Sequence, residues 1–147
     1  VNEAIQKLYA RHTVLLTDAC HSGGIGGGGY GTRAAGDETL NAINRAFLQD
    51  LQATQSGLAI LTASEARQLS REGEQWGGGH GVFTWFLLQG LEGAADSDGD
   101  QIVRLGELLE YVRDNVRRET NNGQIPAFGS NAFDRFMPMA VVPPDEN

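Results

Sequence analysis

One cysteine stands where its thiol could act as a nucleophile. Cys20 lies in the run Asp18-Ala19-Cys20-His21-Ser22-Gly23-Gly24. A thiol attacks a carbonyl carbon only as the thiolate, which near neutral pH requires a neighbouring base or cation. The backbone N–H of Cys20 can contribute to an oxyanion hole, and the glycines that follow leave room for a substrate backbone. The residues therefore predict acyl transfer through Cys20, and the alternative is a small, buried, inert thiol.

The candidate nucleophile follows a predicted buried strand. Residues 13–17 form a short apolar run rich in β-forming residues, and residues 58–63 form another. Apolar stripes predict helices over 82–91 and 105–119, and residues 136–142 read as a last strand. Alternating strands and helices indicate an α/β fold with a largely parallel sheet covered by helices on both faces. Open sheets of this kind carry their sites at the carboxyl ends of strands.

The hexapeptide Asp18 to Gly23 resembles the nucleophile motif of the metacaspase and bacterial caspase-like branch of the caspase clan, peptidase family C14. Residues 61–64, 68–72 and 79–84 resemble the small-subunit half of the same family, and the likeness spans residues 13–128. The resemblance implies a caspase-like three-layer fold, with a mostly parallel sheet flanked by helices, and the activity of a cysteine endopeptidase. This chain would be the C-terminal part of the catalytic domain.

The expected organisation is one partial catalytic domain over residues 1–142, followed by a disordered tail at 143–147. Within the domain, residues 1–22 hold the nucleophile strand, 23–57 a glycine-rich linker and a helix that begins at Asp37, and 58–142 the small-subunit-like part. The two or three strands seen in the sequence are fewer than the about 4–6 of a typical sheet. We therefore expect N-terminal strands to be missing from this chain.

None of the three histidines suits the role of general base. His12 begins the strand that Cys20 follows, so about 25 Å of extended chain separates them. His21 adjoins Cys20, but successive side chains of an extended segment point apart. His80 lies in the part that resembles the small subunit and is interpreted as structural or groove-lining. We expect an upstream segment or a second chain to supply the catalytic histidine, as the family resemblance implies.

Charge suggests the substrate. In caspases, which cleave after Asp, a Gln two residues before the nucleophile and an Arg of the small subunit meet the substrate acid. The corresponding positions here are Asp18 and, with Ser70 beside it, Glu72. A partly buried carboxylate is most stable beside a cation, so we expect cleavage of protein or peptide substrates after Arg or Lys. The alternatives are that Asp18 caps a local turn and that Glu72 is a solvated surface residue.

Acidic residues at 96–107 offer a second type of site. Their spacing is that of an EF-hand calcium loop, but position six is Gln101, where such loops need Gly. The ligands would be the carboxylates of Asp96, Asp98, Asp100 and Glu107. Calcium is thus a candidate cofactor, and no other cofactor is expected. A glycine run at 24–29 matches a dinucleotide fingerprint, but no helix opens directly after it, so nucleotide binding is not predicted.

Composition excludes some classes of partner. The formal net charge of -8 argues against a nucleic-acid or anionic-membrane surface. No apolar run is long enough to span a bilayer, and a single cysteine allows no internal disulfide. We expect a cytoplasmic protein that cuts its own linker after Arg33, or else keeps it as an uncut flexible segment. Rival functions are a non-catalytic caspase-like binding or assembly module and a calcium-binding interaction domain.

Overall fold

A computed structural model describes residues 7, 9–18, 57–63, 71–129 and 133–142. Cys20, Ser70, Arg33, the helix predicted after Asp37 and the tail at 143–147 lie outside these residues. The elements in chain order are strands β1 (Thr13–Thr17) and β2 (Leu58–Thr62), helix α3 (Val82–Gln89), a π-helical turn η1 (Gly90–Ala94), strand β3 (Ile102–Arg104), helix α4 (Leu105–Glu119), and strands β4 (Ala127–Gly129) and β5 (Pro138–Val141).

Strand β2 lies between two partners of opposite direction. Its parallel pairing with β1 runs in register from Thr13–Leu58 to Thr17–Thr62, and β4 pairs antiparallel on its other side. Strands β3 and β5 form a second, antiparallel pair. The mixed α/β architecture is confirmed. Among the described strands one pairing of three is parallel, so a mostly parallel sheet and missing strands stay predictions.

The central strand β2 is apolar up to its last residue, Thr62, and both of its faces are buried over residues 59–61. Ala59, Leu61 and Ala63 belong to the main core, and each is at most 4% exposed. Ile60 is 2% exposed but lies outside that cluster, because alternate side chains of a strand point to opposite faces. This is the reason for a continuous apolar run in place of the alternation of a half-exposed strand.

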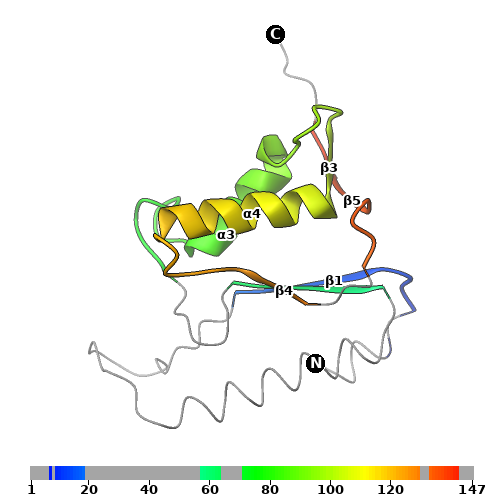
Figure 1. The fold of residues 1–147 in the computed structure, drawn as a ribbon, viewed down its shortest axis with the longest axis horizontal. Helices are drawn as coiled ribbons and strands as arrows, with labels where there is room; N and C mark the ends of the chain where they lie inside the picture. The colour runs from blue at the N-terminus through cyan, green and yellow to red at the C-terminus, as the bar shows by residue number, and fades with distance from the viewer. Residues whose placement is uncertain (1–6, 8, 19–56, 64–70, 130–132, 143–147) are drawn as a thin grey trace.

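Helices α3 and α4 lie together on one face of the β1-β2-β4 sheet (Figure 1). Helix α4 has the predicted bounds, and its predicted apolar stripe is buried in the core: Leu105, Leu108, Leu109, Val112 and Val116. Within the described residues, no helix is both long and apolar enough to cross a membrane.

The helix predicted over residues 82–91 ends earlier than expected. Helix α3 ends at Gln89, not at Leu91, and the chain widens into η1. Gly93, inside that turn, has a φ of 122°, which a residue with a side chain rarely adopts. The turn redirects the chain into the acidic loop at 96–101, and β3 then returns it to α4. Strand β5 is likewise shorter than the predicted 136–142.

Candidate active site

Asp18 directly follows β1 at its carboxyl end, and its side chain is exposed. The hydroxyl of Thr84 donates a hydrogen bond of 2.5 Å to Asp18 Oδ2, although the residues are 66 positions apart. Thr84 lies in the first turn of α3, where the helix dipole favours negative charge. The bond therefore fixes the carboxylate at the junction of β1 and α3. The residues that would form a local turn capped by Asp18 lie outside the described residues.

Gly81 makes the close approach of Asp18 feasible. A Cβ atom at Gly81 would come within 2.8 Å of Asp18 Oδ2 and 3.8 Å of the Arg71 carbonyl oxygen. Contacts below about 3 Å are not tolerated without a shift of one partner, so any side chain here would displace the carboxylate. The requirement for Gly at this position is steric, since its φ is ordinary for any residue at -66°.

Glu72 reaches the same place from another segment. It forms an antiparallel bridge with Gly81, and the flanking backbone bonds run from Val82 N to Arg71 O (2.9 Å) and from Gly73 N to His80 O (3.4 Å). The side chain of Glu72 is exposed. Asp18 and Glu72, 54 positions apart in the sequence, thus both border Gly81 at the start of α3.

Neither of these two carboxylates is neutralised within the described part of the chain. Asp18 accepts the Thr84 hydroxyl and forms no ion pair there. No hydrogen bond or ion pair joins the carboxylate of Glu72 to another described residue. Two exposed carboxylates on residues that both border Gly81, neither of them paired with a cation among the described residues, are chemically suited to bind a cationic group. A group that can donate several hydrogen bonds suits such a site best.

Two of the three histidines, His12 and His80, lie within the described residues. His12 precedes β1 and Asp18 follows it, so the strand's length, about 20 Å, separates them. His80 is exposed, and its backbone closes the loop that starts at Gly73: its N–H donates to Trp76 O at 3.0 Å. Cys20, His21 and Ser70 lie outside the described residues.

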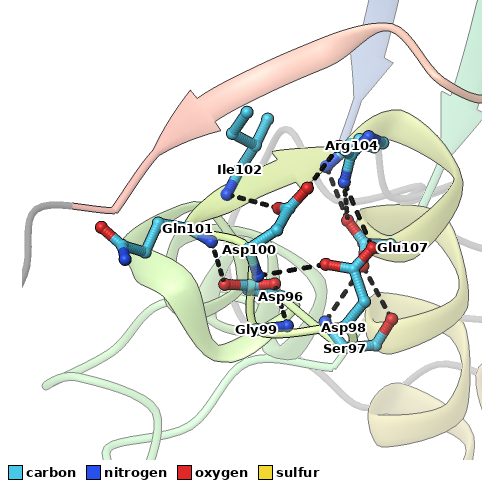
Figure 2. A network of polar contacts seen from close by, with 9 residues as sticks. All are labelled: Asp96, Ser97, Asp98, Gly99, Asp100, Gln101, Ile102, Arg104 and Glu107. Carbon is cyan, nitrogen blue, oxygen red and sulfur yellow. Dashed lines mark hydrogen bonds and ion pairs between the residues drawn. The ribbon is translucent and has the colours of Figure 1, made fainter.

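The acidic loop is the other cluster of carboxylates, and Figure 2 shows its contacts. Asp96 accepts the N–H groups of Gly99 and Gln101, and Asp100 accepts that of Ile102. Gln101, at the position where a calcium loop needs Gly, has a φ of 68°. The loop therefore adopts the left-handed conformation despite the side chain, at a cost of about 1 kcal/mol or more.

Arg104 neutralises part of this loop. Its guanidinium contacts Asp100 at 2.5 Å, Asp98 at 3.4 Å and Glu107 at 3.9 Å. The hydrogen bond from Arg104 is the main cause that lowers the pKa of Asp100, and the same pair raises the pKa of Arg104. Asp100, one of the four predicted ligands, is thus already engaged by a cation.

Glu107 connects the loop to helix α4. Its Oε2 accepts the backbone N–H of Arg104 at 2.9 Å, and its Oε1 accepts the N–H and the hydroxyl of Ser97. The Arg104 N–H is the largest of the causes that lower the pKa of Glu107. Ligand oxygens of Asp96, Asp98 and Glu107 lie within 4.8 Å of one another, so these three could also hold a metal ion.

Three residues of functional interest were not predicted from the sequence. Thr84 and Gly81 lie within the segment 79–84 that resembles the family, but nothing in the sequence assigned them to Asp18. Gln124 is fully buried and carries two side-chain hydrogen bonds to distant backbone groups. A buried amide in a tail that otherwise reads as extended chain gives no sequence signal, because its partners lie 53 and 61 positions away.

A comparison with protein families identifies the chain. No curated protein and no solved structure matches it. A model of the caspase domain of family C14, a family of cysteine peptidases, matches residues 1–137, nearly the whole sequence. The match covers the strand that leads to Cys20, both segments that border Gly81 and helix α4. The chain therefore belongs to the caspase-domain peptidase family.

Proposed function

We propose that this chain carries the nucleophile and the substrate-binding carboxylates of a cysteine endopeptidase that cleaves after Arg or Lys. The observation that carries the proposal is the meeting of Asp18 and Glu72 at Gly81, without a neutralising cation among the described residues. Membership of the caspase-domain family supports the cysteine chemistry. The basic preference rests on the two carboxylates.

The position of Asp18 relates the two parts of the proposed site. Asp18 is two residues before Cys20 in the sequence, and it is anchored to Thr84 through only one carboxylate oxygen. No described residue bonds the other oxygen, which could accept a guanidinium or ammonium group, and a guanidinium can bond two acceptors at once. A basic side chain held there would bring the following peptide bond close to the cysteine, since the two residues are near neighbours in the chain.

The proposed reaction proceeds through an acyl-enzyme. The Cys20 thiolate attacks the carbonyl carbon of the scissile bond, and the backbone N–H of Cys20 stabilises the oxyanion. An imidazolium donates its proton to the leaving amine as the C–N bond breaks. The same imidazole then takes a proton from water, which attacks the thioester and releases the acid together with free Cys20.

The imidazole is proposed to come from a segment upstream of this chain or from a second chain. The position of His12 at the far end of β1 from Asp18 argues against a role at this site. His80 lies in the segment 79–84 that resembles the small subunit, whereas the family resemblance implies a catalytic histidine upstream of the cysteine. These features support a dyad completed from outside, in which this chain contributes Cys20.

The test is hydrolysis of fluorogenic peptides ending in Arg, Lys or Asp. The chain is produced together with any native sequence that precedes Val1, and Cys20→Ala is the control. We expect cleavage after Arg and Lys that the substitution abolishes. Cleavage after Asp would keep the peptidase but contradict the roles of Asp18 and Glu72. If no peptide is cleaved and iodoacetamide does not label Cys20 at mild pH, the chain is a non-catalytic caspase-like module instead.

A further inference from the structure

Gln124 is one of two buried polar residues in the described core, and both ends of its side-chain amide are hydrogen-bonded. It is 0% exposed, and it lies in the segment between α4 and β4. Its Oε1 accepts the N–H of Arg71 at 2.8 Å, and its Nε2 donates to the carbonyl of Ala63 at 2.9 Å. The partners fix the orientation of the amide, since an N–H can meet only the oxygen and a carbonyl only the NH2 group.

The two partners border the segment that leads to the proposed substrate carboxylates. Ala63 immediately follows β2, and Arg71 immediately precedes Glu72. Residues 64–70, which include Ser70, connect them. One side chain therefore holds both the point where the chain leaves the sheet and the point where it arrives beside Gly81.

The Arg71 peptide is held from both sides. Gln124 binds its N–H, and the carbonyl oxygen of Arg71 accepts the N–H of Val82 at the start of α3. The second of these bonds belongs to the bridge that places Glu72 next to Gly81. A continuous set of hydrogen bonds thus leads from Gln124 to the bridge between Glu72 and Gly81, the residue that also borders the Asp18 carboxylate.

Gln124 is itself anchored to the end of α4. The N–H of Gln124 donates to Thr120 Oγ1 at 3.0 Å, and that hydroxyl donates to the carbonyl of Val116 at 2.7 Å. Thr120 is 1% exposed. Buried hydrogen bonds in a low-dielectric core are costly to break, because the freed groups cannot pair with water. The amide is therefore supported by a rigid helix end and not by a surface loop.

We propose that Gln124 is a positioning residue for substrate binding, which fixes Arg71 and thereby Glu72 relative to Asp18 through its paired bonds to Ala63 and Arg71. The inference rests on the proposed function for the role of Glu72 in substrate binding. The two hydrogen bonds from Gln124 to Ala63 and Arg71, called the clamp below, do not themselves depend on catalysis. Gln124 does not touch the substrate. Its loss is expected to affect the binding of the basic side chain and not the reactivity of the thiol.

The experiment compares Gln124→Met with the parent protein, again with any native sequence that precedes Val1. Methionine keeps the volume of the side chain and removes both hydrogen bonds. We expect KM for an Arg-ending peptide to rise on the order of tenfold, because small displacements of binding groups are costly. The rate at which iodoacetamide labels Cys20 should not change. The matched control is Gln89→Met, which removes one long, exposed bond to Glu92 and should leave KM unaltered.

Two further readouts separate positioning from folding. Gln124→Glu can keep both bonds only while its carboxyl group is protonated, since a carboxylate cannot donate to the Ala63 carbonyl. Its KM should therefore rise with pH relative to that of the parent. Amide hydrogen exchange at Arg71 should accelerate in Gln124→Met, while exchange at Leu61 in β2 should not.

The outcomes distinguish the clamp from the function. Faster exchange at Arg71 in Gln124→Met, together with a raised KM for the Arg-ending peptide, supports the proposal. If the protein instead cleaves an Asp-ending peptide and Gln124→Met raises the KM for it, the clamp is supported and the basic specificity is rejected. If the parent cleaves nothing, faster exchange at Arg71 still supports the clamp and unchanged exchange rejects it. Unchanged KM, or a lower apparent kcat alone through loss of folded protein, overturns the positioning role.

Discussion

The chain contains two groups of carboxylates that differ in how their charge is satisfied. At the start of α3, Asp18 holds one hydroxyl and Glu72 has no described partner, so both are exposed without a cation. In the loop before α4, every carboxylate accepts backbone N–H groups, and Arg104 pairs with three of them. Equal residue type therefore does not mean equal role. We propose that the first group binds a cation from outside, whereas the second stabilises a turn and the start of a helix.

This difference could not have been derived from the sequence. Both groups appear there as acidic residues near glycines, and the spacing at 96–107 is the more regular of the two. The regular spacing favours a metal site in the sequence, but Arg104, at the ninth position of the loop that begins at Asp96, supplies a cation from within the chain. The pairing of Asp18 with Thr84 joins residues 66 positions apart, so no local pattern contains it.

The elements were predicted where the signal is long or strongly apolar. Helix α4 has five apolar residues at helical spacing, and its bounds agree with the prediction. Strand β1 has the predicted bounds, but it is only half-buried and its Leu16 is exposed, so the prediction of a buried strand is confirmed for β2 and wrong for β1. Strands β3 and β4, of three residues each, are too short for any periodicity and were not predicted. Cys20 and Ser70 lie outside the described residues, so their roles stay predictions.

The largest expected effect comes from the charge of Asp18. Asp18→Asn keeps an oxygen for the Thr84 hydroxyl and removes the negative charge. We expect kcat/KM for Arg- and Lys-ending peptides to fall on the order of a hundredfold, as for the loss of a charged hydrogen-bonded partner. The matched control is Glu74→Gln, which removes an exposed charge from the loop between Glu72 and His80. Equal effects of the two substitutions would show that only the net charge of the surface matters.

A smaller effect is expected from the group that orients Asp18. Thr84→Val keeps the shape of the side chain and removes the hydroxyl, so the carboxylate becomes free to rotate. We expect kcat/KM for basic peptides to fall about fivefold, which corresponds to one hydrogen bond of about 1 kcal/mol. Thr84→Ser should restore the parent value in the same assay. If Thr84→Val has no effect while Asp18→Asn does, the bond to Thr84 is not part of substrate binding.

Removing the ion pairs of Arg104 in the acidic loop should lower the stability of the protein and leave its peptidase activity unchanged. Arg104→Met removes the guanidinium from beside Asp98, Asp100 and Glu107. We expect Tm to fall by a few degrees, and millimolar calcium to raise Tm more in this variant than in the parent, since the uncompensated carboxylates then attract cations. Arg135→Met, which breaks the exposed pair with Glu110, is the control. A calcium response that is larger in the parent would contradict the view that Arg104 serves as the internal cation.

The smallest expected effect concerns the acid stability of the same loop. The pKa of Glu107 is lowered in the fold, so its contribution is fully present above its ordinary value of 4.5 and is lost as pH falls through the lower folded value. Glu107→Gln removes this dependence. Thermal unfolding at intervals from about pH 6 to about pH 3 should show a flatter decline of Tm for the variant. Parallel curves would mean that Glu107 does not gain its bonds to Arg104 and Ser97 on folding.

The most direct test of the central claim is covalent capture by substrate-like reagents. Acyloxymethyl ketone peptides ending in Arg or in Asp are incubated with the protein, including any native sequence before Val1, and the modified residue is located by mass spectrometry. Under the proposed function, the Arg reagent should modify Cys20 rapidly and in preference to the Asp reagent, and Asp18→Asn should abolish this preference. Preferential modification by the Asp reagent, or modification at a residue other than Cys20, would contradict the proposed function.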